Sequence, residues 1–405
     1  MKRRLFLLLL GSLGAYSSCA VSKQNHHSMV AEEKLSQDSN LLAQENTPSS
    51  LRELAASKGL IYGAFPQRGF NDFDQDIPFK SVFLRESSLL VGGFYGVSIG
   101  PQNGNMYNFQ AADNYFNFAK ENNLKFRGHP LIWNEFNSPW LVEKFKNNNT
   151  TSSEIQQVFV SHISTVVKRY AGQVHSWDVV NEAINPEDGR PDGLRDTLKS
   201  GIRGEFHRSW LHFLGPEHIE LAFRVAAEAD PNAILTYNEH SMEYNFGWQE
   251  RRRQVILKTL ERLKARGIPI HALGIQSHLN ASWNQYFDGK RFRTFLSDIA
   301  SLGLEIMITE LDVMDRDLSS SQEDRDRQIA QAYYQYLSVA LDEPAVSTVI
   351  NWGLSDRYTW LSSFAPRPDG EPVRPLPFDS QLNYKQSWSA IAKAFEEAPS
   401  RNFSS

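Results

Sequence analysis

Apolar runs of strand length recur along most of the chain, and amphipathic stretches of helical length separate several of them. The apolar runs lie at residues 60–65, 88–96, 125–133, 174–180, 233–239, 272–279, 305–313 and 346–354. Amphipathic stretches lie at 111–123, 219–230 and 253–267. Near-continuous apolar strands that alternate with helices are typical of a parallel sheet covered by helices. The pattern predicts an α/β fold, a (β/α)8 TIM barrel, in a single domain over residues 51–397, with a short tail at 398–405.

The first fifty residues follow a different pattern. Lys2, Arg3 and Arg4 precede the apolar run at 5–15, which is too short to span a bilayer. A basic segment before a short apolar run predicts a signal peptide over residues 1–19 and an exported chain, secreted or periplasmic. Residues 20–50 are polar and nearly free of aromatic side chains, so we expect a flexible linker.

The only cysteine of the chain, Cys19, stands at the end of the predicted signal. Small residues followed by Cys at this place resemble a bacterial lipobox, in which the cysteine is lipidated. Tyr16 departs from that pattern, because such motifs usually carry an aliphatic residue three positions before the cysteine. Two interpretations stay open: a lipoprotein tethered to a membrane through Cys19, or ordinary cleavage nearby.

The charge and composition of the chain limit the kinds of molecule that it can be expected to bind. The chain has 405 residues, 22% of them charged, and a formal net charge of −5 without a block of like charge. This composition argues against nucleic acid and favours a neutral, polar substrate. No glycine-rich phosphate loop opens a helix, so we expect no nucleotide cofactor, and no second His or Cys stands at ligand spacing from His129, so we expect no metal. We expect a monomer.

Polar side chains cluster where the predicted strands end. Barrel enzymes carry their reacting groups at the carboxyl ends of the strands. The residues at these ends are His129, Trp133, Asn181, Glu182, Asn238, Glu239, Gln276, His278, Glu310, Asp312 and Trp352. Three carboxylates beside aromatic rings indicate glycoside hydrolysis, which uses two carboxyl groups, while sugar faces stack on tryptophan.

Five blocks resemble, in order and spacing, those of glycoside hydrolase family 10. They are "RGHPLIW" (127–133), "WDVVNEA" (177–183), "GIQSHL" (274–279), "ITELDV" (308–313) and "NWGLSDRYTWL" (351–361). The resemblance runs from about residue 51 to 394. It implies a retaining β-glycanase, most commonly an endo-1,4-β-xylanase acting on a polysaccharide or oligosaccharide. By position, Glu182 would be the general acid/base, Glu310 the nucleophile, and Asn181 the residue that holds the 2-hydroxyl of the reacting sugar.

The remaining catalytic roles follow from the chemistry of these groups. Glu310 must be ionised to attack, and a hydrogen bond from His278, itself oriented by Asp312, would favour the charged form. A retaining mechanism needs the two carboxyl groups roughly 5 to 5.5 Å apart. Our predicted substrate contacts are His129, Trp133, Asn134, Gln276, Trp352, Trp360, Phe94 and Tyr95.

Several of these residues have a second interpretation. Glu239 could claim the acid role by itself, although the family pattern gives the Asn-acid pair of strand five a supporting function. Asp178 and Asp312 could be buried hydrogen-bond acceptors or could act electrostatically. Trp352 and Trp360 could pack in the core instead of stacking on a sugar.

Two segments depart from the family pattern. Strand two carries "VGGFYGVS" (91–98) where the family usually has a "PENEMKW"-like segment that binds the sugar beyond the cleavage point. Strand three has Asn134 and Phe136 where the family usually has His and Gln. The sequence therefore predicts the type of reaction more firmly than it predicts the substrate. Besides a xylanase, we consider a β-glycosidase whose sugar stacks on Phe94, Tyr95 and Phe136, and a surface-tethered glycan-binding protein without turnover. The last is disfavoured, because both glutamates, Asn181 and His278 are present.

Overall fold

Eight parallel strands form the centre of the structure, a computed structural model that describes residues 49–200, 207–319 and 321–401. The predicted signal peptide, Cys19 and residues 20–48 of the predicted linker lie outside the described residues. In chain order the barrel strands are β1 (Ile61–Ala64), β2 (Leu89–Gly93), β3 (Lys125–His129), β5 (Ser176–Asn181), β6 (Ile234–Glu239), β7 (Ala272–Ile275), β9 (Glu305–Met314) and β10 (Val346–Asn351).

The sheet closes on itself. Each strand pairs in parallel with the next, and β10 pairs with both β9 and β1, so that Ile61 lies opposite Thr348 and Ala64 opposite Asn351. The Tyr62 hydroxyl donates a hydrogen bond of 2.9 Å to Asn351 Oδ1 across this seam. The predicted (β/α)8 barrel is confirmed.

Two of the predicted strands are interrupted. The run 125–133 forms β3 and a separate β4 (Ile132–Trp133), because Pro130 between them has no N–H for the ladder. The run 272–279 forms β7 and β8 (His278–Asn280), because Ser277 takes a left-handed φ of 62° that breaks the extended backbone. β8 pairs with the upper part of β9, where His278 lies opposite Asp312.

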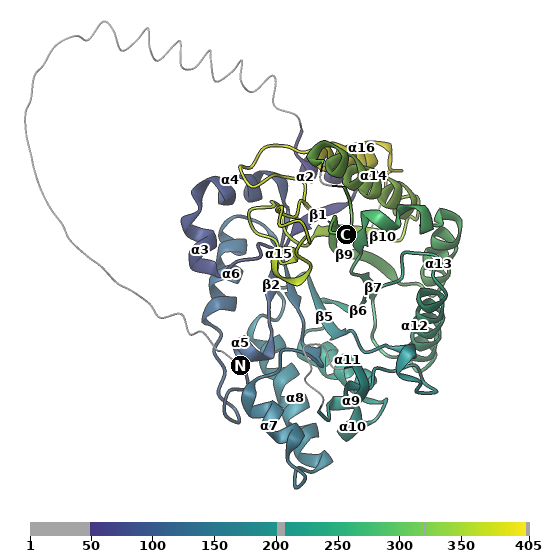
Figure 1. The fold of residues 1–405 in the computed structure, drawn as a ribbon. Coiled ribbons are helices and arrows are strands. Elements are labelled where there is room, and N and C mark those ends of the chain that lie inside the picture. Colours follow the sequence, from purple (N-terminus) through teal and green to yellow (C-terminus); the bar gives the residue numbers. More distant parts are fainter. Residues whose placement is uncertain (1–48, 201–206, 320, 402–405) are drawn as a thin grey trace, which may run out of the picture. The chain divides into compact units, whose positions relative to one another are not determined.

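Helices surround the strands on the outside (Figure 1). The α-helices are α2 (Leu51–Ser57), α3 (Phe70–Gln75), α4 (Ile77–Glu86), α5 (Gly96–Ile99), α6 (Gln110–Glu121), α7 (Pro139–Lys146), α8 (Ser152–Arg169), α9 (Thr197–Ser200), α10 (Trp210–Leu214), α11 (His218–Ala229), α12 (Gly247–Ala265), α13 (Gly289–Ser301), α14 (Gln322–Ala340), α15 (Leu361–Phe364) and α16 (Gln386–Glu397). Short 3₁₀ helices are η1 (Pro186–Asp188) and η3 (Ala281–Tyr286). Within the described residues, none of these helices has the length and apolar character that crossing a membrane requires.

Helix α8 illustrates how local sequence sets these elements. Thr151 accepts the backbone N–H of Glu154, and the Glu154 side chain accepts the backbone N–H of Thr151, which closes a capping box. Lys168 and Arg169 lie in the last turn, where positive charge complements the helix dipole. The face that contains Phe159 and Ile163 is buried, and the Phe159 ring packs edge-on against Trp210 of α10 and His218 of α11.

The barrel interior contains a buried charge. Arg127 on β3 forms an ion pair with Asp178 on β5, and its guanidinium also donates to Ser176 Oγ at 3.0 Å. A buried arginine needs such partners, since its charge has left water. This ion pair holds Asp178 inside the barrel, where the residue is 1% exposed. On the neighbouring strand positions, Gly128 leaves room for the Trp177 ring, because a Cβ on Gly128 would come within 2.0 Å of that ring.

Candidate active site

Two glutamates reach the mouth of the barrel from opposite parts of the sheet. Glu182 directly follows β5, and Glu310 lies within β9. Their exposed fractions are only 8% and 5%, so both residues are largely buried. Glu182 has a left-handed φ of 55°, which is uncommon for a side chain of this size and often accompanies function.

Three amide side chains connect the two glutamates. Gln276 Nε2 donates to Glu182 Oε1 at 3.0 Å and to Asn181 Oδ1 at 3.3 Å. Asn238 Nδ2 donates to Asn181 Oδ1 at 2.9 Å and to Glu310 Oε1 at 2.8 Å. Because these residues come from four different strands or strand ends, the network fixes the relative positions of the two carboxyl groups.

His278 lies between two carboxylates. Its Nδ1 is 2.9 Å from Asp312 Oδ1 and its Nε2 is 3.3 Å from Glu310 Oε2. Burial disfavours the charged imidazole, but Asp312 and Glu310 together raise the pKa of His278 well above its ordinary value. A protonated ring donates from both nitrogens, which favours the ionised form of Glu310. The structure thus brings Glu310, His278 and Asp312 into the predicted contact.

His129 forms a second polar group beside Glu310. Its Nδ1 is 2.8 Å from Asp178 Oδ2 and 3.9 Å from Glu310 Oε1. Burial lowers the pKa of His129, but Glu310 and Asp178 outweigh this effect and raise it. Asp178 therefore acts here as a buried acceptor for Arg127 and His129. Nowhere in the described ranges do three or more His, Cys, Asp or Glu side chains form a group that could hold a metal ion.

Aromatic rings line one side of the mouth. Trp133 Nε1 donates to Glu182 Oε2 at 3.1 Å, and its ring stacks on Phe136 at a centroid distance of 5.0 Å. The half-buried Tyr95 packs against both rings and against His129. Burial, and then the carboxylates of Glu310, Glu182 and Asp178, raise the pKa of Tyr95 far above its ordinary value, so its hydroxyl stays protonated.

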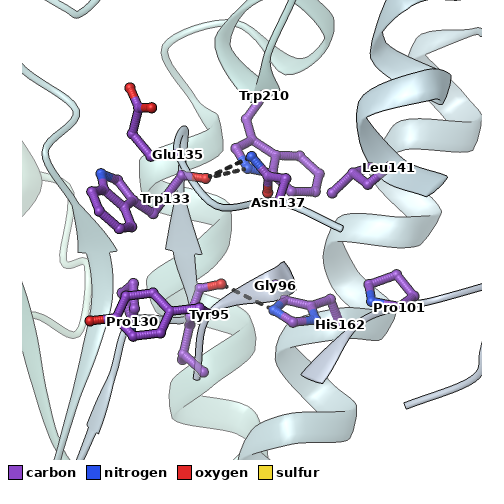
Figure 2. Close-up of a pocket in the computed structure, with 12 residues that line it drawn as sticks. Tyr95, Gly96, Pro101, Pro130, Trp133, Glu135, Asn137, Leu141, His162 and Trp210 are labelled. Atoms are coloured by element: carbon purple, nitrogen blue, oxygen red, sulfur yellow. Dashed lines mark hydrogen bonds between the residues drawn. The ribbon is translucent and has the colours of Figure 1, made fainter. Parts of the chain in front are cut away.

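A small cavity lies behind Trp133, and its walls hold this residue in place (Figure 2). The Trp133 carbonyl accepts hydrogen bonds from Trp210 Nε1 and Asn137 Nδ2, both at 3.3 Å. The neighbouring Asn134 is half-buried in the loop between β4 and α7. These hydrogen bonds therefore fix the backbone of Trp133, whose indole N–H donates to Glu182.

Phe94 does not line the site, and its predicted role as a sugar contact is wrong. Its side chain is 1% exposed and packs edge-on against Phe126, Tyr170 and Trp177 in the core. The chain turns after β2 ends at Gly93, so Phe94 packs into the core between the strands and the helices, while Tyr95 packs against His129 and Trp133 at the mouth.

The two predicted stacking tryptophans differ in their surroundings. Trp352 is buried, stacks on Phe65 at a centroid distance of 4.4 Å and meets His129 edge-on at 5.1 Å. Trp360 is half-buried, and its Nε1 donates to Asp312 Oδ2 at 2.7 Å. Core packing therefore covers most of the Trp352 side chain. Trp360 instead lies beside the hydrogen bond between His278 and Asp312.

Glu239 lies below the mouth and has no exposed surface. Its Oε1 accepts hydrogen bonds from the Ile184 backbone N–H at 2.8 Å and from the Tyr237 hydroxyl at 3.0 Å, and its Oε2 is 3.4 Å from Arg252. Burial raises the pKa of Glu239 to about 7, although Arg252 opposes the shift. A carboxyl group without exposed surface cannot protonate a substrate, so its contacts indicate a supporting function for the segment that carries Glu182.

Sequence reasoning missed Arg195. This buried arginine, in the segment after β5, donates to Glu182 Oε2 at 3.3 Å and to Glu135 Oε1 at 2.8 Å. Its only signal in the sequence is a basic residue that follows an apolar Leu194 in a polar loop, which is weak. Arg195 thus places a positive charge beside Glu182, and its other partner, Glu135, adds a second carboxylate nearby.

Comparison with known proteins identifies the family of this barrel. The model of glycosyl hydrolase family 10 matches residues 13–394. The chain belongs to this family. Its barrel is similar to that of xylanase 10B from Thermotoga petrophila RKU-1 in complex with xylobiose, with a TM-score of 0.73 and 30% identity over 87% of this chain and 98% of that one.

Relatives of this family 10 chain differ widely in length. Endo-1,4-beta-xylanase B of Thermotoga neapolitana is 30% identical, with 86% of this chain and 92% of the relative covered. Endo-1,4-beta-xylanase A of Caldicellulosiruptor sp. (strain Rt8B.4) is 35% identical over 66% of this chain, but the match covers only 38% of that longer protein.

Proposed function

We propose that this family 10 protein is a retaining endo-β-1,4-xylanase that hydrolyses β-1,4-xylosidic bonds with Glu182 and Glu310. The observation that carries the proposal is the hydrogen-bond network that joins both carboxyl groups and places His278, backed by Asp312, on Glu310. The xylanases of Thermotoga neapolitana and Thermotoga petrophila, similar over most of their length, support xylan as the substrate.

In the first step, a Glu310 oxygen attacks the anomeric carbon while Glu182 gives its proton to the glycosidic oxygen, whose bond to that carbon breaks. In the second step, Glu182 takes a proton from water, the water oxygen bonds to the anomeric carbon, and Glu310 leaves as carboxylate. His278 and Asn238 donate to Glu310 and stabilise its charge before and after the reaction. Asn181, held by Asn238 and Gln276, is positioned to hold the 2-hydroxyl of the reacting sugar.

The test is hydrolysis of xylan, arabinoxylan, mixed-linkage glucan and glucomannan, and of aryl β-xylobioside and β-cellobioside, by the wild type and by Glu310→Ala. We expect activity on xylan and on aryl β-xylobioside, and a loss of roughly 10⁴-fold or more in Glu310→Ala. Glu182→Ala should yield a β-configured glycosyl azide when azide is added, because azide needs no general base to attack the intermediate. Activity only on another glycan would contradict the xylanase assignment. Binding without turnover in the wild type would favour the glycan-binding protein instead.

We propose further that the chain is exported and acts as a monomer, either tethered to a membrane through Cys19 or cleaved nearby without lipidation. Support comes from the basic and apolar residues at 2–15 and from the position of the single cysteine. Cell fractionation of the wild type and of Cys19→Ser tests the tether, since loss of lipidation should move the protein from the membrane to the soluble fraction. Equal distribution of both forms would contradict it. Sedimentation of the purified chain tests the monomer.

A further inference from the structure

The side chain of Gln67 joins the loop after β1 to the loop after β10. Gln67 lies between β1 and α3 and is half-buried. Its Nε2 donates a hydrogen bond of 2.6 Å to the Trp352 carbonyl, and its Oε1 accepts the backbone N–H of Trp360 at 3.1 Å. One amide group thus uses both its donor and its acceptor on the backbones of two tryptophans that lie beside the candidate active site.

The backbone conformation of Gln67 indicates that its side chain matters. Its φ is 60°, in the left-handed region that a side chain of this size rarely adopts. Residues held in such a conformation cost free energy, and they are found most often at functional sites. Glycine adopts this φ freely, so a glycine would serve the turn alone at least as well. The turn therefore does not account for a glutamine here, whereas its two side-chain hydrogen bonds do.

Trp360 links Gln67 to the proposed nucleophile. Its ring lies 5.0 Å from the His278 ring between centroids, and its Nε1 donates to Asp312 Oδ2 at 2.7 Å. The other oxygen of Asp312 is 2.9 Å from His278 Nδ1, and His278 Nε2 is 3.3 Å from Glu310 Oε2. A continuous series of contacts therefore connects the loop after β1 with the carboxylate that attacks.

The loop after β1 has anchors that do not involve the Gln67 side chain. The Phe65 backbone N–H donates to the Asn351 carbonyl at 3.0 Å, and the Tyr115 hydroxyl donates to the Arg68 carbonyl at 2.5 Å. Loss of the Gln67 side chain should therefore leave the loop in place and release only the two tryptophan backbones.

We propose that Gln67 is a positioning residue, which fixes Trp360 so that its indole N–H stays on Asp312 and His278 stays on Glu310. This inference rests on the proposed function, since the carboxylate that benefits is the nucleophile of that reaction. Gln67 acts through Trp360 and does not take part in the chemistry itself. A displacement of about 1 Å at a reacting group can lower a rate by roughly 100-fold, so a contact of this kind has a measurable effect.

The first experiment compares the kinetics of Gln67→Gly with those of the wild type on aryl β-xylobioside. We expect kcat to fall roughly 5- to 50-fold and KM to change less than about threefold, with an unchanged urea midpoint. Arg68→Ala is the matched control, because it removes a different contact between the same two loops, the Arg68 guanidinium 4.4 Å from the centroid of the Tyr358 ring. An unchanged kcat in Gln67→Gly, or an equal loss in Arg68→Ala, would overturn the proposal.

A double-mutant cycle with Trp360→Phe tests whether the effect passes through the indole. Trp360→Phe keeps an aromatic ring but removes the N–H that Asp312 accepts. If Gln67 acts through that N–H, the double variant should lose no more than about twofold in kcat beyond the worse single variant. Losses that multiply would mean that the two residues act independently, and they would contradict the proposal.

Hydrogen exchange of the Trp360 indole keeps this test separate from that of the proposed function. The chain has nine tryptophans, and the nitrogen-15 NMR signal of the Trp360 indole is the one that Trp360→Phe removes. We expect this N–H to exchange with solvent roughly 10-fold faster or more in Gln67→Gly and at the wild-type rate in Arg68→Ala. Faster exchange in a chain that hydrolyses no glycan would support the positioning of Trp360 while the proposed function fails. Equal exchange in Gln67→Gly and the wild type would overturn the positioning role, whether or not the chain is active.

Discussion

The adjacent residues Phe94 and Tyr95 show how a single position decides between stability and binding. Phe94 fills a space between Phe126, Tyr170 and Trp177, whereas Tyr95 lies beside His129 and Trp133 at the mouth. One residue therefore belongs to the core and the other to the predicted substrate surface.

We predict opposite effects from substitutions at these two positions. Phe94→Ala should lower the free energy of unfolding by about 3 to 5 kcal/mol, because it leaves a cavity among buried rings. Tyr95→Phe keeps the ring and removes only the hydroxyl, so it should leave stability within about 0.5 kcal/mol and raise KM for xylan. Urea unfolding and steady-state kinetics of both variants measure this contrast. A rise in KM for Phe94→Ala without a loss of stability would contradict the placement of Phe94 in the core.

The sequence around these residues explains the error in their assignment. "GGFYG" contains two aromatic residues between glycines and has no alternation that would tell an inward from an outward side chain. Glu182 and Glu310 were easier to place, because each lies in a block that resembles the family. Arg195 lies in a loop without periodicity, so only the folded structure shows its contact with Glu182.

At the scale of elements, hydrogen bonds from β6 and α12 hold the segment that follows β5. Glu239 at the end of β6 accepts the Ile184 N–H, and Arg252 on α12 donates to the Ile184 carbonyl at 2.5 Å. The backbone N–H of Glu182 also donates to the Asn238 carbonyl at 3.0 Å. These bonds fix the backbone at Glu182, which has a left-handed φ of 55°, and at Ile184 two residues later.

We predict that Glu239→Ala lowers kcat by roughly 10- to 100-fold while KM changes little, because the reacting position of Glu182 shifts and the sugar contacts remain. Tyr237→Phe is the matched control, since it removes a different hydrogen bond to the same carboxyl group. Circular dichroism and kinetics of both variants give the comparison. An unchanged kcat in folded Glu239→Ala would contradict a positioning role.

The elements themselves could largely be predicted. The eight apolar runs correspond to the eight barrel strands, because a parallel strand buried on both faces needs an uninterrupted apolar sequence. Sequence alone did not show that β8 is separate from β7, since the left-handed Ser277 between them looks like any other strand residue. The break directly precedes His278, whose Nε2 lies 3.3 Å from Glu310 Oε2.

At the scale of the whole molecule, buried histidines make stability depend on pH. Burial lowers the pKa of His162 to about 4, and that of His218 to about 4, from the ordinary value of 6.5. His162 Nε2 lies 3.1 Å from the Leu131 carbonyl, and its Nδ1 has no partner among the described residues. A lowered pKa means that the unfolded chain binds the proton more readily than the folded one.

We predict that His162 and His218 lose their contribution to the folding stability as pH falls below about 6.5. The stability that the neutral rings provide is fully present above the unfolded pKa and is lost as pH falls toward about 4. Between pH 7 and pH 5 the loss should be about 2 kcal/mol for each histidine. His162→Gln retains an amide donor for the Leu131 carbonyl but does not titrate, so its urea midpoint should fall less over this pH range than that of the wild type. Parallel declines in the two proteins would contradict the prediction.

The seam between β1 and β10 also determines when this protein can fold. The two strands meet through residues that are 289 positions apart, as in the bond from Tyr62 to Asn351. While the chain is being synthesised, β1 and β9 therefore keep unpaired edges until β10 has left the ribosome. Unpaired edges of this kind are where neighbouring chains aggregate. A nascent chain that stops before residue 346 has every catalytic side chain described above but no closed barrel to hold them, so it should be a substrate for chaperones and proteases rather than a smaller enzyme.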